Sequence, residues 1–327
     1  MLNLTKTQKI CIQYGFLLLL ICMTVYLVST TLDITLIPMI MKLVNKKFIF
    51  IGFLIMVLYI ILECTIINIL IKTIQKTKVR FLAVKIAMMG FYYNLVTPFA
   101  SGSQPMQIYA LNKYDINLSK SIAIVTNKTV LFQTVVTIYS AVIIFLNIEV
   151  LKNELPSMLV LMSIGMVMNI VSLLGGMLIV LTPNTMKIIV KVIVNILYRL
   201  NIFKSLNKKI HTINKFIDEY SYSIKLFIKN KKALCLSIIL TIIQLTVFFS
   251  ISYCVYKAFN LNGLSLFEVL SLQVFLYMSV SPIPTPGNVG ANEVAFLTIF
   301  ANVFPGNIIG YSVFLYSIYV YYFLVVV

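Results

Sequence analysis

The chain is poor in acidic residues and histidine and has no tryptophan, and these shortages exclude several classes of function. Its 327 residues include 26 Lys and Arg but only 9 Asp and Glu, which gives a formal net charge of +17. His211 is the single histidine, so a zinc site or a histidine-based triad is limited to one ligand of that type. We therefore expect no metal and no cofactor. The basic residues are spread over loops between apolar runs, a distribution that does not predict nucleic-acid binding.

The cysteines and the loops lack the patterns of other common sites. No two cysteines have paired spacing, and all lie in or beside apolar runs: Cys11, Cys22, Cys64, Cys235 and Cys254. They are interpreted as small hydrophobic residues, not as a disulfide or metal-binding framework. The sequence also contains no nucleotide-binding loop, so nothing in it indicates coupling to a nucleotide.

Apolar residues dominate the chain. They make up 61% of it, charged residues make up 11%, and the mean hydropathy is +1.01. Soluble domains are about half apolar and about a quarter charged, so this composition indicates an integral membrane protein. We expect an all-α polytopic membrane protein with about six full spans and two re-entrant or broken helical hairpins, forming one transmembrane domain over residues 1–327.

The expected full spans are apolar runs long enough to cross a ~30 Å hydrocarbon core. They cover residues 10–32, 48–71, 121–148, 157–181, 233–256 and 307–327. The first follows Lys6 and Lys9 but is too long for a signal peptide, so we expect a retained anchor. Within the fourth, Gly165, Gly175 and Gly176 predict close helix packing.

The distribution of charge predicts an orientation. Basic clusters at residues 72–85 and 187–232 should be cytoplasmic, whereas loop 149–154, with two acids and one lysine, should be external. This predicts a multi-pass protein of the cell membrane with a cytoplasmic N-terminus. Residues 182–232 should form a basic segment with an amphipathic helix at the inner face of the membrane.

Two stretches, residues 94–107 and 281–293, place prolines, glycines and small polar residues inside apolar sequence. Non-helical backbone at membrane depth is tolerated only when it is buried in protein or lines a wet cavity. We expect broken hairpins at residues 86–112 and 266–305 that open from opposite faces of the membrane. Two broken hairpins of opposite orientation are typical of inverted-repeat transporters, in which the substrate site lies between the breaks. The sequence identity between the two halves of this chain is too weak to establish a repeat.

The polar side chains at or near these breaks are the candidate substrate contacts: Thr97, Ser101, Gln104, Gln107, Lys128, Asn292 and Glu293. The breakers themselves are the candidate backbone frame: Pro98, Gly102, Pro105, Pro284, Pro286, Gly287 and Gly290. A helix that restarts near Pro105 would direct amide donors at an anion, and a packing kink would use the same residues. The stretches contain no nucleophile paired with a base, so no catalytic residue is predicted.

Charged residues inside the runs leave two interpretations open. Charges within spans are costly and usually face a partner or a wet pathway. Glu63 and Lys128 are predicted either to pair with each other or to leave Lys128 free to bind a lipid phosphate. Glu293, in the first turn of the helix after the second break, is predicted either to cap that helix or to hold a cationic headgroup.

The two breaks resemble those of a known family. Residues 97–109 read Thr-Pro-Phe-Ala-Ser-Gly-Ser-Gln-Pro-Met-Gln-Ile-Tyr, and residues 284–293 read Pro-Thr-Pro-Gly-Asn-Val-Gly-Ala-Asn-Glu. Together they resemble the membrane region of the lysylphosphatidylglycerol synthase/flippase family over nearly the whole chain. Ser103 and Asn288 stand where a second glycine is expected in each motif.

The resemblance implies a function that involves membrane lipids. It implies a flippase-like domain that moves polar-headgroup lipids between leaflets, with anionic or aminoacylated phospholipids or polyprenyl-phosphate lipids as partners. In larger family members an aminoacyl-transfer domain follows the membrane region, but residues 182–232 are too few and too basic to be that domain. The alternatives are a membrane subunit of a lipid-modifying transferase, such as phosphatidylglycerol lysyltransferase, and a small-solute transporter.

Overall fold

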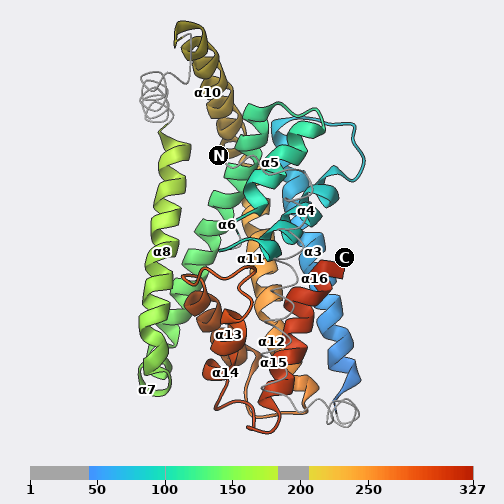
Figure 1. Cartoon of the computed structure of the whole chain (residues 1–327), viewed down its shortest axis with the longest axis vertical. Coiled ribbons are helices and arrows are strands. Elements are labelled where there is room, and N and C mark those ends of the chain that lie inside the picture. Colours follow the sequence, from blue (N-terminus) through green and yellow to red (C-terminus); the bar gives the residue numbers. More distant parts are fainter. Residues whose placement is uncertain (1–43, 100, 183–205, 327) are drawn as a thin grey trace, which may run out of the picture.

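The computed structural model describes residues 44–99, 101–182 and 206–326, and all regular elements in these ranges are helices (Figure 1). Five segments are long and apolar enough to cross a membrane: Lys46–Ile74, Leu118–Leu146, Met158–Leu178, Lys231–Ala258 and Ile309–Val326. The prediction of an all-α polytopic membrane protein is therefore confirmed. The expected span at residues 10–32 and the basic helix expected after residue 186 lie outside the described residues.

The observed spans overlap the expected ones and differ mainly at their ends. The long elements are α3 (Lys46–Ile74), α6 (Leu118–Leu146), α8 (Pro156–Leu181) and α11 (Lys231–Phe249), which α12 (Ile251–Ala258) continues. The last span consists of α15 (Ile309–Ser317), the π-helical η2 (Ile318–Tyr322) and α16 (Phe323–Val326). The short α7 (Ile148–Glu154) and the amphipathic α10 (Leu206–Lys229) lie at opposite ends of the bundle (Figure 1).

Two pairs of shorter helices surround the proline-rich and glycine-rich breaks. The first pair is α4 (Leu82–Val96) and α5 (Ser103–Lys113), and the second is α13 (Leu266–Val280) and α14 (Ala291–Ile299). In Figure 1 the first pair lies toward the end that carries α10, and the second lies toward the end that carries α7. Each pair therefore enters the bundle from its own end and turns back within it.

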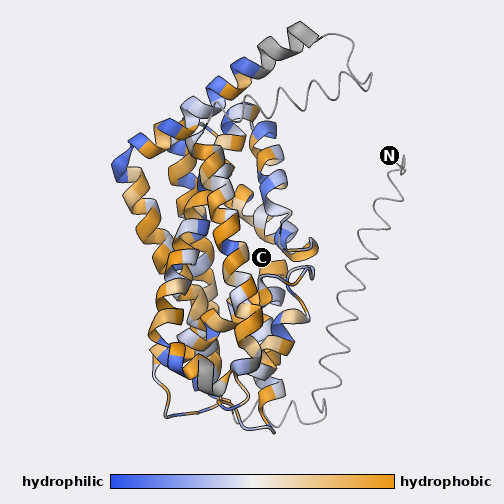
Figure 2. Cartoon of the chain, turned by 90° about the vertical axis from the view of Figure 1, so that its left-hand side faces the viewer, coloured by the Kyte–Doolittle hydropathy of each residue, from blue (hydrophilic) through white to orange (hydrophobic). Residues whose placement is uncertain are grey.

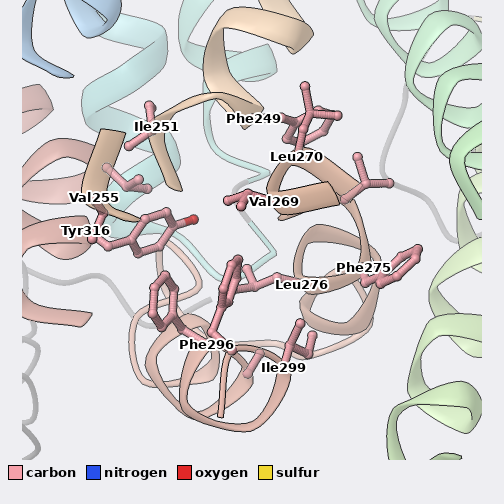
Figure 3. Packing of buried hydrophobic residues seen from close by; sticks show 14 of the residues in the cluster. Phe249, Ile251, Val255, Val269, Leu270, Phe275, Leu276, Phe296, Ile299 and Tyr316 are labelled. Carbon is pink, nitrogen blue, oxygen red and sulfur yellow. The ribbon is translucent and has the colours of Figure 1, made fainter. Parts of the chain in front are cut away.

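An aromatic core fixes the second hairpin against the last span. The ring centroids of Phe296 and Phe300 are 4.3 Å apart, and those of Phe296 and Tyr316 are 5.1 Å apart. Figure 3 shows Phe296 and Tyr316 among the aliphatic side chains of α12 and α13, including Val255 and Leu276. Offset and tilted ring pairs of this kind add to the packing energy, so α14 is held firmly in place.

The outer surface has the polarity expected of a membrane protein. Hydrophilic residues gather at the end that carries α10, while the sides of the bundle are hydrophobic (Figure 2). On α8, Val160, Val167, Val171 and Leu178 are exposed. Apolar side chains exposed along the length of a helix are unusual on a soluble monomer and are compatible with surrounding lipid.

Glycines on α8 allow close approach at two of the three predicted positions. A methyl group at Gly165 would lie 2.0 Å from the Met278 carbonyl oxygen of α13, and one at Gly176 would lie 2.8 Å from Cγ2 of Val130 on α6. A methyl group at Gly175 would have no neighbour within 4 Å in the described part of the chain. The prediction of close packing is confirmed for Gly165 and Gly176 and is wrong for Gly175, which faces open space.

These contacts predict opposite effects of two alanine substitutions on α8. Gly165→Ala should lower the free energy of unfolding by about 1–3 kcal/mol, because the methyl group collides with backbone that has little room to move. Gly175→Ala should raise it by up to about 1 kcal/mol through helix propensity. Thermal unfolding of both variants in detergent micelles measures the difference, and equal melting temperatures would contradict the packing described here.

Candidate functional site

The tips of the two broken hairpins touch. Pro98 and Pro286 form an isolated antiparallel β-bridge, and the backbone N–H of Gly287 donates to the Thr97 carbonyl oxygen at 3.4 Å. The turns come from opposite ends of the bundle, so this contact joins the two halves of the chain (Figure 1). Each turn supplies polar backbone partners to the other at a depth where lipid offers none.

The first tip satisfies its own backbone groups. The Thr97 hydroxyl donates to the Tyr93 carbonyl oxygen at 2.6 Å and accepts from the Gly102 N–H at 2.8 Å. The Ser103 N–H donates to Oδ1 of Asn94 at 3.3 Å. Two amides at the start of α5 are therefore bound to side chains of the hairpin itself, and they do not point freely at an anion.

The second tip depends on left-handed backbone conformations. Gly287, Asn288 and Gly290 have φ angles of 57°, 60° and 82°. A methyl group at Gly287 would also lie 2.7 Å from the Leu95 carbonyl oxygen, so this position requires glycine for both conformation and space. Asparagine tolerates the left-handed region better than most residues, which explains how Asn288 occupies a position where glycine is expected.

Glu293 caps the helix that follows the second tip. Its Oε2 accepts from the Gly290 N–H at 2.7 Å, and its Oε1 accepts from the Ser317 hydroxyl at 2.9 Å. The side chain is buried. Of the two interpretations left open by the sequence, the structure shows the helix cap, and both carboxylate oxygens are engaged by the protein.

A cavity of about 130 Å³ lies beside the junction of the tips. Its wall contains aromatic rings, carboxamides and aliphatic side chains, and none of the described residues that line it carries a full charge. The aromatic lining residues are Tyr59, Phe91, Phe248, Tyr277, Tyr316 and Tyr321. The carboxamide residues are Asn94, Gln273, Asn288 and Asn292. Aromatic rings attract cations through their faces, and carboxamide oxygens accept hydrogen bonds, so these residue types favour a cationic, hydrogen-bond-donating ligand.

Gln273 lines this cavity and has a hydrogen-bond acceptor without a partner among the described residues. The side chain is 1% exposed, and its Nε2 donates to the Tyr316 hydroxyl at 2.7 Å. Its Oε1 is buried and has no hydrogen-bond partner among the described residues. Leaving a buried acceptor unpaired costs about 1–3 kcal/mol, so the oxygen favours a ligand that donates a hydrogen bond. Sequence reasoning missed this residue, although a lone glutamine in an apolar helix was a usable signal.

The last span places two tyrosines in the cavity wall. Tyr316 and Tyr321 are five residues apart on either side of the start of η2, and a π turn brings residues at this spacing onto one face. Asn292 Nδ2 donates to the Tyr321 hydroxyl, which donates to the Asn288 carbonyl oxygen at 3.1 Å. The π segment and these bonds connect the last span to the second tip.

A charge cluster lies next to the cavity along α3. Lys128 of α6 forms an ion pair with Glu63, and Nε2 of Gln244 on α11 donates to Glu63 Oε2 at 3.0 Å. Glu63 is one helical turn from Tyr59, which lines the cavity. The pairing left open by the sequence is therefore observed, and Gln244, which sequence reasoning missed, completes the cluster by joining a third helix.

The other predicted contacts lie away from the cavity or hold the hairpin together. Nε2 of the buried Gln107 donates to the Ile86 carbonyl oxygen at 3.2 Å, which ties α5 to α4. The exposed Ser101 donates to the Pro98 carbonyl oxygen at 2.9 Å, and Gln104 is half-buried on the first turn of α5. Of the predicted contacts and frame residues, Asn292 and Gly287 line the cavity.

Three other predicted frame residues lie at the tips and differ in exposure. Pro105 and Pro284 are exposed, and Gly102 is buried against Thr97. Among the described residues, no group of three or more His, Cys, Asp or Glu side chains could hold a metal ion. The site therefore consists of the tip junction, the aromatic and carboxamide cavity, and the Glu63–Lys128–Gln244 cluster.

Comparison with known proteins places the chain in a family. The family model described as lysylphosphatidylglycerol synthase TM region matches residues 12–327 of the chain. No curated protein and no solved structure matches it.

The charge cluster predicts unequal effects of single and double substitutions. Lys128→Ala should lower the free energy of unfolding by about 3–5 kcal/mol, because it leaves the Glu63 carboxylate buried without its counter-charge. The double variant Glu63→Gln/Lys128→Met removes both charges and should be less destabilising than Lys128→Ala alone. Denaturant titration in detergent measures both, and a double variant that is no more stable than Lys128→Ala would contradict this coupling.

Proposed function

Because the chain belongs to the family of lysylphosphatidylglycerol synthase transmembrane regions, we propose that it moves a polar-headgroup lipid between the leaflets of the membrane. The observation that carries this proposal is the contact between Pro98 and Pro286, where two broken hairpins from opposite ends of the bundle meet. In transporters built on broken helices, substrates bind near the midplane between the breaks. Parting of the tips would open a polar path there for the headgroup, while the acyl tails stay in the bilayer.

The cavity beside the tips supports a headgroup that carries an amino group. An ammonium group donates hydrogen bonds, and the unpaired Oε1 of Gln273 lacks a donor. The rings of Tyr59, Tyr277 and Tyr316 line the same cavity and attract cations through their faces. No described lysine or arginine lines it to bind a phosphate, so among the lipids considered an aminoacylated phospholipid fits better than one whose only charge is negative.

The contact between the tips favours a closed state. Pro98 and Pro286 are bridged and the Gly287 N–H is bonded to the Thr97 carbonyl oxygen, so a headgroup can pass between the tips only after these contacts break. Carrying a bare charged group through hydrocarbon is costly, and the amide oxygens and ring faces lower that cost. Translocation therefore requires the tips to separate and re-form their contact.

The orientation follows from the charge distribution. The end that carries α10 holds the basic residues near the start of the first hairpin, including Lys76, Lys78 and Arg80. The positive-inside rule makes this end cytoplasmic in the cell membrane. The first hairpin then opens toward the cytoplasm and the second toward the outside, so each leaflet has its own side of the junction.

Gln273→Leu tests the headgroup assignment. In proteoliposomes, the variant should move fluorescently labelled lysylphosphatidylglycerol at least about tenfold more slowly than the wild type, because a hydrogen bond to a charged group contributes about 1.5–3 kcal/mol. The control Gln75→Leu removes an unpaired glutamine oxygen at the end of α3, outside the cavity, and should leave the rate nearly unchanged.

Three results would contradict the proposal. If Gln273→Leu moves the labelled lipid at the wild-type rate, the cavity does not bind the headgroup. If the wild-type protein moves no aminoacylated, anionic or polyprenyl-phosphate lipid, the proposal of lipid translocation is wrong. Formation of an aminoacylated lipid from phosphatidylglycerol and aminoacyl-tRNA, without lipid movement, would assign the chain to a lipid-modifying transferase.

A further inference from the structure

A second, larger cavity lies on the side of the bundle. It has a volume of about 510 Å³ and lies between α6, α8, α10 and α11. Almost all of its lining is apolar, and the lining residues on α6 run from Asn127 to Ile143, a distance of ~24 Å at ~1.5 Å per residue. On α11 they recur at every fourth position, at Leu234, Ile238 and Ile242. The cavity, here called the α6–α11 groove, therefore runs parallel to the helix axes.

The groove opens to the outer surface of the bundle. Ile138 and Val142 on α6 are 58% and 51% exposed, and Ile238 and Ile242 on α11 are 37% and 42% exposed. These are membrane-spanning helices, so the medium that reaches the groove is the hydrocarbon of the bilayer. A groove of ~24 Å is long enough for an acyl chain, which in the bilayer occupies a leaflet about half of the ~30 Å core.

Asn127 gives one end of the groove a polar group without a partner. The side chain is 4% exposed and lines the groove, and its Nδ2 is buried with no hydrogen-bond partner among the described residues. An unsatisfied buried donor costs about 1–3 kcal/mol, so its retention in an apolar wall points to an acceptor that arrives with a ligand. Its neighbour Lys128 is bound to Glu63, and Asn127 does not line the cavity at the tips.

We propose that the α6–α11 groove binds one acyl chain of a membrane phospholipid, and that Asn127 Nδ2 donates a hydrogen bond to the ester carbonyl of that chain. The apolar wall fits the hydrocarbon tail, and the carboxamide fits the polar group at which the tail begins. Asn127 lies in the half of α6 nearer the end that carries α10, so the bound lipid belongs to the leaflet on that side. The groove could hold this lipid whether or not the protein moves lipids between leaflets, so the inference does not rest on the proposed function.

Photo-crosslinking in lipid nanodiscs tests the occupant. A phosphatidylglycerol with a diazirine in its acyl chain should label peptides that contain the groove residues of α6 and α11. Ile242→Trp fills the groove and should reduce this labelling to the level of the surrounding surface. The matched control is Ile243→Trp, because Ile243 is 43% exposed on the same helix and does not line the groove. Equal labelling in the two variants would overturn the proposal.

Asn127→Leu tests the polar contact separately from the fold. The amount of phospholipid that co-purifies in mild detergent should fall about two- to tenfold, which corresponds to the loss of one hydrogen bond. The thermal stability of the delipidated protein should be unchanged or higher, because the substitution removes an unsatisfied donor. Lower stability with unchanged lipid content would assign Asn127 a purely structural role and overturn the proposal.

A second experiment, with a diazirine-bearing amino acid substituted for Ile238 in the groove, identifies competing occupants. Crosslinks between the groove and residues 1–43 or 183–205, or between two copies of the chain, in place of lipid adducts would also overturn the proposal. These outcomes are distinct from those for the tips, because Gln273→Leu should leave labelling of the groove intact.

Discussion

The structure depends on one constraint, which is that backbone inside a bilayer must find its hydrogen-bond partners within the protein. Residues 97–99, 101–102 and 281–290 are not helical, and each tip meets this requirement with local side chains and with the other tip. The Thr97 carbonyl oxygen, free of its own helix, accepts from Gly287 across the junction. Two breaks that would be unfavourable alone therefore stabilise each other through a backbone bridge between segments that are distant in the sequence.

The polar side chains of the interior are organised around this junction. The Glu63–Lys128–Gln244 cluster joins α3, α6 and α11 by neutralising its own charge, so it contributes to the arrangement of the helices. The cavity beside the tips retains an unpaired oxygen on Gln273. Two of the described buried polar atoms without a partner belong to residues that line a cavity, Gln273 beside the tips and Asn127 in the α6–α11 groove, while others, such as those of Thr137, Ser140 and Ser237, lie elsewhere in the bundle.

The sequence predicted the features that depend on local chemistry. Prolines and glycines located both breaks, and apolar runs located the described spans to within a few residues. It did not predict which polar side chains line the cavity, because Gln273, Tyr316 and Tyr321 meet only when the second hairpin packs on the last span. The π turn that brings the two tyrosines to one face has no simple sequence signal, and the predicted contacts Thr97, Gln107 and Glu293 prove to be bonded within the fold.

The most direct test of the account is to lock the two tips together. Bridged residues in an antiparallel pair have Cα atoms ~4.5–5.5 Å apart, a separation that a disulfide can join. A Pro98→Cys/Pro286→Cys variant, made in a background without the native cysteines, should move no lipid in proteoliposomes when oxidised and should regain transport when reduced, while each single variant stays active in both conditions. Transport by the oxidised, fully cross-linked protein at the rate of the reduced protein would contradict a pathway between the tips.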